Sequence, residues 1–122
     1  MVNKLDASEC KKWLMKIYPS PIPFSLEFSP RITKTRYGSY SHGTRKIRIY
    51  YKVHNRSINE VLITVIHEYA HHIQYAELDA EENGYKPHGK EFRQILYTLI
   101  TIAVQKSLFK SDLIEDILQS SL

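Results

Sequence analysis

The sequence predicts one compact α+β domain, in which a small antiparallel sheet packs against a central helix with further helices around it. Its 122 residues, of which 43% are hydrophobic, are enough for one core and too few for several. Apolar residues alternate along part of the first half and recur at helical spacing elsewhere, which indicates both strands and helices. We find no internal repeat and no domain boundary, so residues 1–122 are assigned to a single domain.

The N-terminal part is predicted to form a short helix followed by an extended segment. Apolar residues recur at helical spacing from Ala7 to Ile17, and Asp6 with Glu9 forms a capping box at the start. Four prolines between positions 19 and 30 then exclude a regular helix. Apolar residues alternate from Phe24 to Phe28, as they would in a short strand.

Residues 31–53 predict two antiparallel strands joined near Gly43. The segment before this glycine is rich in turn-forming residues. After it, from Lys46 to Val53, one set of apolar residues alternates with a second set that consists of three basic residues and Tyr50. This period of two predicts a strand with one buried face and one solvated face.

The most apolar helix is predicted in the middle of the chain. Ser57 and Glu60 form a capping box, and apolar residues follow over residues 61–73 on most of the helix circumference. A helix that is apolar on most sides is expected to be central.

The C-terminal part is predicted to hold a loop and two further helices. Residues 77–87 contain four acids, a glycine and a proline, which indicates a connecting loop. A helix is expected from about Gly89 to Lys106, and Asp112 with Glu115 begins a last short one.

A metal-binding motif lies inside the central helix. Residues 67–71 read His-Glu-Tyr-Ala-His, and two imidazoles and a carboxylate are costly to bury there without a partner such as a metal ion. Because residues i and i+4 project from one helical face, His67 and His71 can both reach one tetrahedral ion at about 2.0–2.1 Å. Glu68 lies about 100° further round the helix, toward the open coordination position. The alternative is that these residues form a solvated polar stripe on the helix surface. It would have to accommodate two histidines and a glutamate among apolar neighbours.

This arrangement predicts hydrolysis with Glu68 as the catalytic residue. Zinc lowers the pKa of a coordinated water to about 7. A neighbouring carboxylate can take the proton of this water and later pass it to a leaving amine. We therefore expect peptide-bond hydrolysis and one zinc ion per chain.

Catalytic zinc usually takes three protein ligands, so the chain should supply one more. The metzincin continuation His-x-x-Gly-x-x-His is absent, because Gln74 and Glu77 occupy those places. Two downstream residues remain as candidates. Glu91 would complete a site of two histidines and one glutamate, whereas His88 stands just before the next predicted helix.

Residues 88–92 read His-Gly-Lys-Glu-Phe. Together with residues 67–71, this segment resembles the SprT-like metallopeptidases, which include the DNA-dependent protease Spartan. That family pairs an H-E-x-x-H helix with a downstream His-Gly-x-x-Phe/Trp segment, and the resemblance covers roughly Leu5 to Thr101. No cysteine-rich zinc ribbon or tail with partner-binding motifs follows in this sequence, so the family's cellular role is not carried over.

The resemblance implies a zincin-like fold and a zinc-dependent metalloendopeptidase that acts on a protein substrate, including DNA-bound or crosslinked proteins. It implies His88 as the third zinc ligand beside His67 and His71. It also implies a supporting role for Glu91 and a packing role for Phe92.

The charge distribution suggests a nucleic-acid contact. Residues 31–56 hold eight bases and no acid, whereas residues 57–122 hold five bases and ten acids. The alternating strand places four residues on one face, which could contact phosphates and stack on an unpaired base of single-stranded or partly unwound DNA: Lys46, Arg48, Tyr50 and Lys52. The alternative is a strand face that charge keeps solvated and unpaired.

Other features define the expected setting of the protein. Cys10 is the single cysteine, which excludes a disulfide framework and a thiolate metal site and fits a reducing compartment. The first residues do not resemble a secretion signal, and the longest apolar run is too short to span a membrane. We expect a cytoplasmic location, or a nucleoid or nuclear one if DNA is bound. His72 is expected at the surface or behind the metal ligands.

Two rival functions stay open at this point. One is an effector or toxin-type protease that does not depend on DNA. The other is a non-catalytic zinc domain that binds DNA or protein. The intact Glu68 argues against the second rival, and the cationic segment argues against the first.

Overall fold

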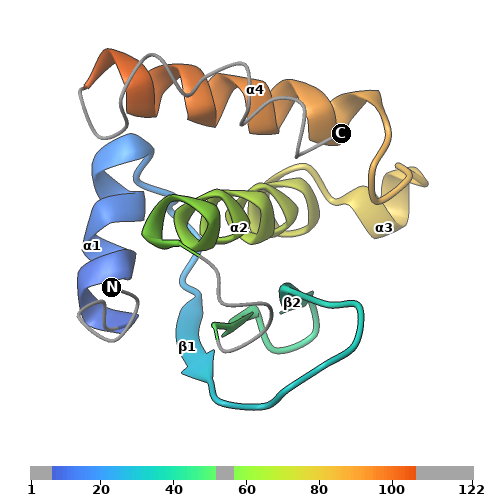
Figure 1. Cartoon of the computed structure of the whole chain (residues 1–122). Coiled ribbons are helices and arrows are strands. Elements are labelled where there is room, and N and C mark those ends of the chain that lie inside the picture. The colour runs from blue at the N-terminus through green and yellow to red at the C-terminus, as the bar shows by residue number, and fades with distance from the viewer. Residues whose placement is uncertain (1–6, 52–56, 107–122) are drawn as a thin grey trace.

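The computed structural model describes residues 7–51 and 57–106 of the chain. In chain order its elements are α1 (Ala7–Ile17), β1 (Ser25–Ser29), β2 (Gly38–Ser41), β3 (Lys46–Tyr50), α2 (Ile58–His72), the π-helical turn η3 (Ile73–Glu77), α3 (Ala80–Asn83) and α4 (Lys90–Gln105). Helix α2 runs through the middle, with α4 on one side and the sheet on the other (Figure 1). The fold is therefore α+β, as the sequence predicts.

Helix α2 is central because its sequence caps it firmly and makes it apolar. Ser57 Oγ accepts a hydrogen bond from the backbone N–H of Glu60 at 3.2 Å, and the Glu60 carboxylate accepts one from the N–H of Ser57 at 2.9 Å. Val65, Ile66 and Tyr69 have no exposed surface. The predicted capping box and the predicted central helix are both confirmed.

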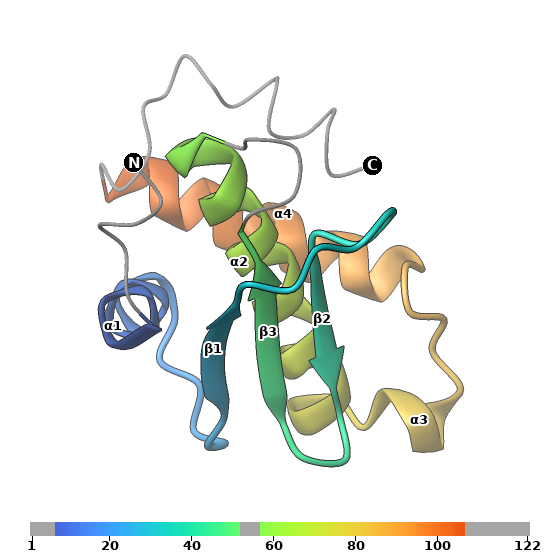
Figure 2. The same cartoon turned by 60° about the horizontal axis from the view of Figure 1, so that its bottom comes forward.

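Helix α1 is also confirmed, and it lies beside β1 (Figure 2). It buries Cys10, Leu14 and Ile17, which recur at helical spacing as predicted. Of the first predicted capping box, Asp6 lies outside the described residues.

The sheet is mixed, so the expectation of an antiparallel sheet is wrong in part. β2 and β3 pair antiparallel across the turn at residues 42–45, as predicted, but β1 pairs parallel with β3. The strand order is β1-β3-β2 (Figure 2). Residues 30–37 connect β1 to β2, which is not its neighbour in the sheet. The place beside β1 is occupied by β3. Ile47 and Ile49 therefore lie in the central strand, which is hydrogen-bonded along both edges. Neither residue has any exposed surface.

The chain after α2 differs from the predicted loop. The helix continues into the π-helical turn η3, in which the N–H of Leu78 donates to the carbonyl of Ile73 at 3.2 Å. The prediction of a loop at residues 77–87 is wrong in part, because this segment includes the short helix α3. Gly84 adopts φ +70° and ends that helix. Helix α4 forms close to the predicted bounds. The predicted helix at 112–118 lies outside the described residues.

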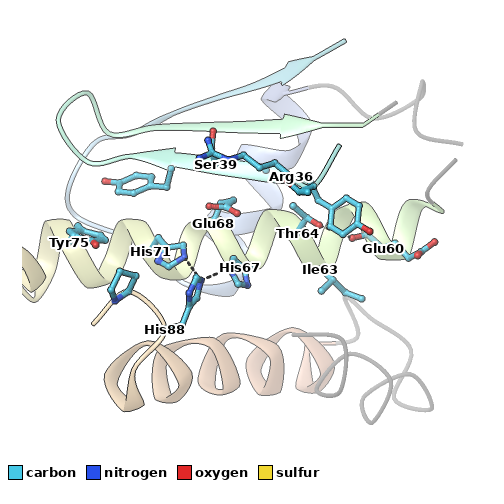
Figure 3. A pocket seen from close by; sticks show the side chains of 15 residues that line it. Arg36, Ser39, Glu60, Ile63, Thr64, His67, Glu68, His71, Tyr75 and His88 are labelled. Atoms are coloured by element: carbon cyan, nitrogen blue, oxygen red, sulfur yellow. Dashed lines mark hydrogen bonds between the residues drawn. The ribbon is translucent and has the colours of Figure 1, made fainter. Parts of the chain in front are cut away.

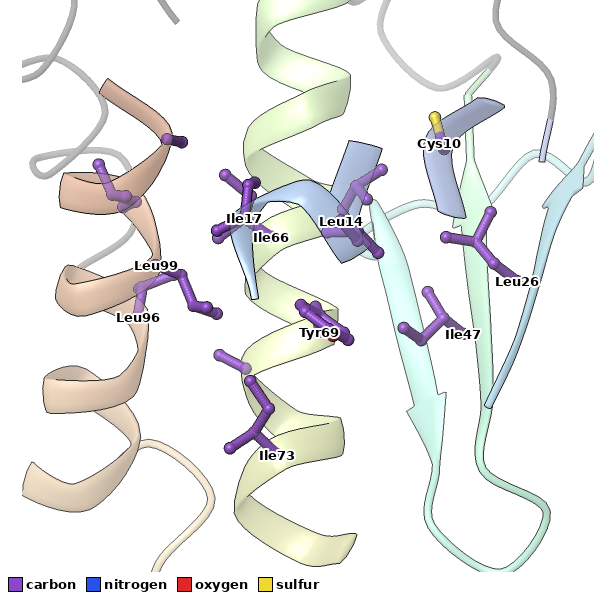
Figure 4. Packing of buried hydrophobic residues seen from close by; sticks show 14 of the residues in the cluster. Cys10, Leu14, Ile17, Leu26, Ile47, Ile66, Tyr69, Ile73, Leu96 and Leu99 are labelled. Carbon is purple, nitrogen blue, oxygen red and sulfur yellow. The ribbon is translucent and has the colours of Figure 1, made fainter. Parts of the chain in front are cut away.

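The core lies on both sides of α2. Ile66 of α2 faces Leu96 and Leu99 of α4, whereas Tyr69 faces the sheet near Ile47 (Figure 4). Rigid packing of α2 between two layers leaves little freedom to the polar residues on it. In the described part of the chain, no helix is long and apolar enough to cross a membrane.

Candidate metal centre

Three histidine side chains converge beside α2. Nε2 of His88 lies 3.2 Å from Nε2 of His71 and 3.3 Å from Nε2 of His67 (Figure 3). Two nitrogens bound at 2.0–2.1 Å to a tetrahedral metal lie about 3.3 Å apart, so these spacings fit a shared ion. Within residues 7–51 and 57–106, this is the cluster of three or more His, Cys, Asp or Glu ligand atoms close enough to hold one metal.

Two structural elements bring the histidines together. His67 and His71 lie one turn apart on α2, and His88 lies in the turn that leads into α4. Phe92 of α4, which is 1% exposed, packs against all three rings with centroid distances of 4.9, 4.3 and 5.1 Å. The packing role that the resemblance implies for Phe92 agrees with this arrangement. The geometry favours His88 over Glu91, which does not join the described cluster.

Burial keeps the helical histidines in the form that binds metals. It lowers the pKa of His67 to about 4 and that of His71 to about 3, and neighbouring imidazoles lower both further. Both rings are therefore neutral at pH 7, with lone pairs available for a metal. Neutral imidazoles gathered around one point fit a divalent cation.

Glu68 faces the same pocket but is not part of the histidine cluster. Its side chain is 7% exposed, and burial raises its pKa to about 7, against a smaller lowering effect of the Arg36 guanidinium. The pocket has a volume of about 850 Å³ and lies between α2 and the segment that includes β2, lined by Glu68 and all three histidines (Figure 3). A carboxylate with this pKa can both accept and release a proton near neutral pH.

Gly38 is a site residue that the sequence reasoning missed. A Cβ atom at this position would lie 3.1 Å from Cγ of Glu68 and 2.9 Å from Cγ2 of Thr64. A side chain on this residue of β2 would therefore press against the side chains of both Thr64 and Glu68. The Tyr-Gly segment at the start of β2 contained the signal, but its partner on α2 could not be read from the sequence.

His72 is buried, which excludes the expected surface position. It has no exposed surface, and its Nδ1 lies 2.9 Å from the hydroxyl of Tyr40. Its Nε2 lies 3.0 Å from the carbonyl oxygen of Ile22, which can only accept, so this nitrogen carries the proton. His72 thus connects α2 with the sheet and with the segment after α1, away from the three-histidine cluster.

The predicted DNA-contacting face is less cationic than the sequence suggested. Lys46 and Arg48 form ion pairs with Glu27 of β1, at 3.2 and 3.0 Å. Tyr50 is only 5% exposed, so the expectation of a solvated ring on this face is wrong. The reason is the position of β3 in the centre of the sheet, where β1 supplies the acid and the hydroxyl of Ser39 in β2 lies 3.3 Å from that of Tyr50. Lys52 lies outside the described residues.

In the metal-free protein, this site should make the free energy of unfolding depend on pH in two opposing ways. His67 and His71 have folded pKa values below their ordinary 6.5, so the unfolded chain binds more protons as the pH falls from 6.5 toward 4, and acid destabilises the fold. Glu68 has a folded pKa of about 7, above its ordinary 4.5, so acid from pH 7 to 4.5 stabilises the fold. Glu68→Gln should therefore steepen the acid loss of stability.

Urea unfolding at pH 7 and pH 5, in the presence of a chelator, measures this difference. The fall in unfolding free energy between the two pH values should be larger for Glu68→Gln than for the wild type. An equal fall in both proteins would mean that the pKa of Glu68 is not raised by burial.

Comparison with known proteins identifies the family. The model of the SprT-like family matches residues 9–109, which include nearly all of the described elements and both histidine segments. Neither the curated proteins nor the solved structures contain a match to the chain. The match covers well over half of the sequence, and so this chain belongs to the SprT-like family.

Proposed function

We propose that this protein is a zinc-dependent metalloendopeptidase that hydrolyses peptide bonds of a protein substrate. One observation carries the proposal: Glu68, a buried carboxylate with a pKa of about 7, lines the same pocket as the convergent nitrogens of His67, His71 and His88. A domain that only bound metal would have no use for such a group. The intact glutamate therefore supports catalysis over a non-catalytic zinc domain.

The donor set supports zinc as the metal. Three histidine ligands with a fourth position open to solvent are typical of catalytic zinc sites. His67, His71 and His88 would hold the ion, with one ion per chain. When bound, zinc supplies a Lewis acid that activates water and polarises the peptide carbonyl.

The residues of the chain account for the proton transfers. Glu68 takes a proton from the attacking water and then donates it to the leaving amine, which needs a pKa near the working pH. Burial provides this pKa, and the close approach of Gly38 leaves Glu68 its space. The bond that breaks is the peptide C–N bond, and the products are a carboxylate and an amine.

Cleavage of casein by the 122-residue chain tests the proposal. Zinc-loaded protein should cleave casein, a chelator should abolish the cleavage, and added zinc should restore it. Absence of cleavage by the zinc-loaded protein, with and without DNA, would overturn the proposal in favour of a non-catalytic zinc domain.

We also propose that single-stranded or partly unwound DNA brings protein substrates to the pocket. Three exposed cations lie along the chain before β2, and the last of them, Arg36, lines the pocket: Arg31, Lys34 and Arg36. Such cations favour phosphate contact, which weakens steeply with salt. The casein assay includes an arm with single-stranded DNA at low salt, where cleavage should increase. Equal cleavage in both arms would favour the DNA-independent protease.

A further inference from the structure

Gln74 lies between the two chain segments that supply the three histidines. It has no exposed surface and belongs to the π-helical turn η3, three residues after His71. Its Oε1 lies 3.3 Å from Nδ1 of His71, and its Nε2 donates to the carbonyl oxygen of Lys86 at 2.8 Å. One side chain thus touches a helical histidine and the turn that carries His88.

These contacts determine which nitrogen of His71 carries a proton. The carbonyl of Lys86 can only accept, so the amide nitrogen of Gln74 must face it and the amide oxygen must face His71. That oxygen can only accept, so Nδ1 of His71 must donate. The lone pair of His71 is then on Nε2, the atom that faces His88 at 3.2 Å.

The other end of Gln74 stabilises the turn that carries the third histidine. The carbonyl oxygen of Lys86 accepts a second hydrogen bond, from the backbone N–H of Gly89 at 3.1 Å. This bond closes a four-residue turn with His88 inside it. His88 has an exposed side chain, so packing alone holds it weakly.

The π-helical turn that holds Gln74 is itself anchored on its other side. The carboxylate of Glu77 accepts hydrogen bonds from the hydroxyls of Tyr18 and Ser20, both at 2.6 Å. π-Helical turns are rare in proteins, and those that do occur are often found at functional sites. The anchored turn gives Gln74 a fixed position under His71.

We propose that Gln74 is a positioning residue that prepares the metal site before the metal binds. It sets the proton on Nδ1 of His71 and restrains the turn that presents His88. The inference rests on the proposed metal site, and it adds a residue that neither histidine motif contains. Residues that hydrogen-bond to a metal ligand typically contribute about 10- to 100-fold to metal affinity.

The test compares zinc affinity of the full chain, measured by chelator competition, in three proteins. Gln74→Met keeps most of the side-chain volume and removes both hydrogen bonds, so its zinc affinity should fall about 10- to 100-fold. Asn83→Ala is the control. It removes two hydrogen bonds from Nδ2 of Asn83 to the carbonyl oxygens of Leu78 and Asp79, none of which Gln74 shares, and its zinc affinity should stay within about twofold of the wild type.

Two further measurements separate positioning from a general loss of folding. Hydrogen exchange of the metal-free proteins should show faster exchange at the N–H of Gly89 in Gln74→Met than in Asn83→Ala. Nitrogen NMR of the metal-free wild type, which needs no variant, should show His71 protonated at Nδ1.

The outcomes distinguish this inference from the proposed function. If the wild type binds no zinc, the proposed function fails. If the wild type binds zinc and Gln74→Met binds it equally well, or if His71 carries its proton on Nε2, the role of Gln74 is wrong and the proposed function stands.

Discussion

Replacing Glu68 by glutamine is expected to reduce peptide hydrolysis by about 10²- to 10⁴-fold, the range that a positioned general acid and base contributes. An amide fills the space of the carboxylate beside Gly38 but cannot accept a proton from water. The variant should still bind zinc, because Glu68 is not in the histidine cluster. The measurement is the rate of casein cleavage, with zinc content determined on the same sample.

The matched control for this variant is Glu82→Gln, which removes the same charge from an exposed position on α3. It should cleave casein at the wild-type rate. Substantial cleavage by Glu68→Gln with zinc bound would remove this glutamate from the mechanism.

Replacing His88 by alanine is expected to produce the second large effect, a loss of zinc. Removing one of the three ligand nitrogens should weaken zinc binding by more than about 100-fold. That is the largest loss typical of residues that only hydrogen-bond to a metal ligand, and His88 would bind the metal directly. Because the side chain of His88 is exposed, the metal-free variant should unfold within about 0.5 kcal/mol of the wild type. Metal analysis and urea unfolding of the metal-free protein measure both quantities.

Glu91→Ala is the control that separates the two candidates for the third ligand. Glu91 lies in the first turn of α4, close in sequence to His88, but outside the cluster of convergent nitrogens. This variant should retain zinc. If Glu91→Ala lost the metal and His88→Ala kept it, the assignment of His88 would be wrong.

Much of the fold could be predicted because the signals are local. Helices α1, α2 and α4 follow from apolar residues at helical spacing, and the start of α2 follows from Ser57 and Glu60 alone. The hairpin of β2 and β3 follows from turn-forming residues around Gly43. Each signal depends on residues within one or two turns of each other, so a single sequence contains it.

Strand order and the surroundings of the strands required the tertiary structure. The alternation of apolar and polar residues predicts that β3 has two different faces. It does not show that β1 lies parallel beside β3 and brings Glu27 next to Lys46 and Arg48. The same limit applies to Tyr50, which is buried and whose hydroxyl contacts that of Ser39 in β2. Period-two patterns describe one strand, whereas sheet topology depends on the connections between strands.

The sequence by itself determined the pair of histidines on one helical face and the glutamate beside them, because spacing of i and i+4 settles this within one helix. Only the tertiary structure placed His88, and not Glu91, beside the two helical histidines. It also buried the glutamate so that its pKa rises to about 7, and it placed Gln74 between the two histidine segments. These outcomes depend on contacts between segments that are distant in the sequence. Such contacts follow from how α2, η3 and the turn before α4 pack together, and packing leaves no periodic signal in the chain.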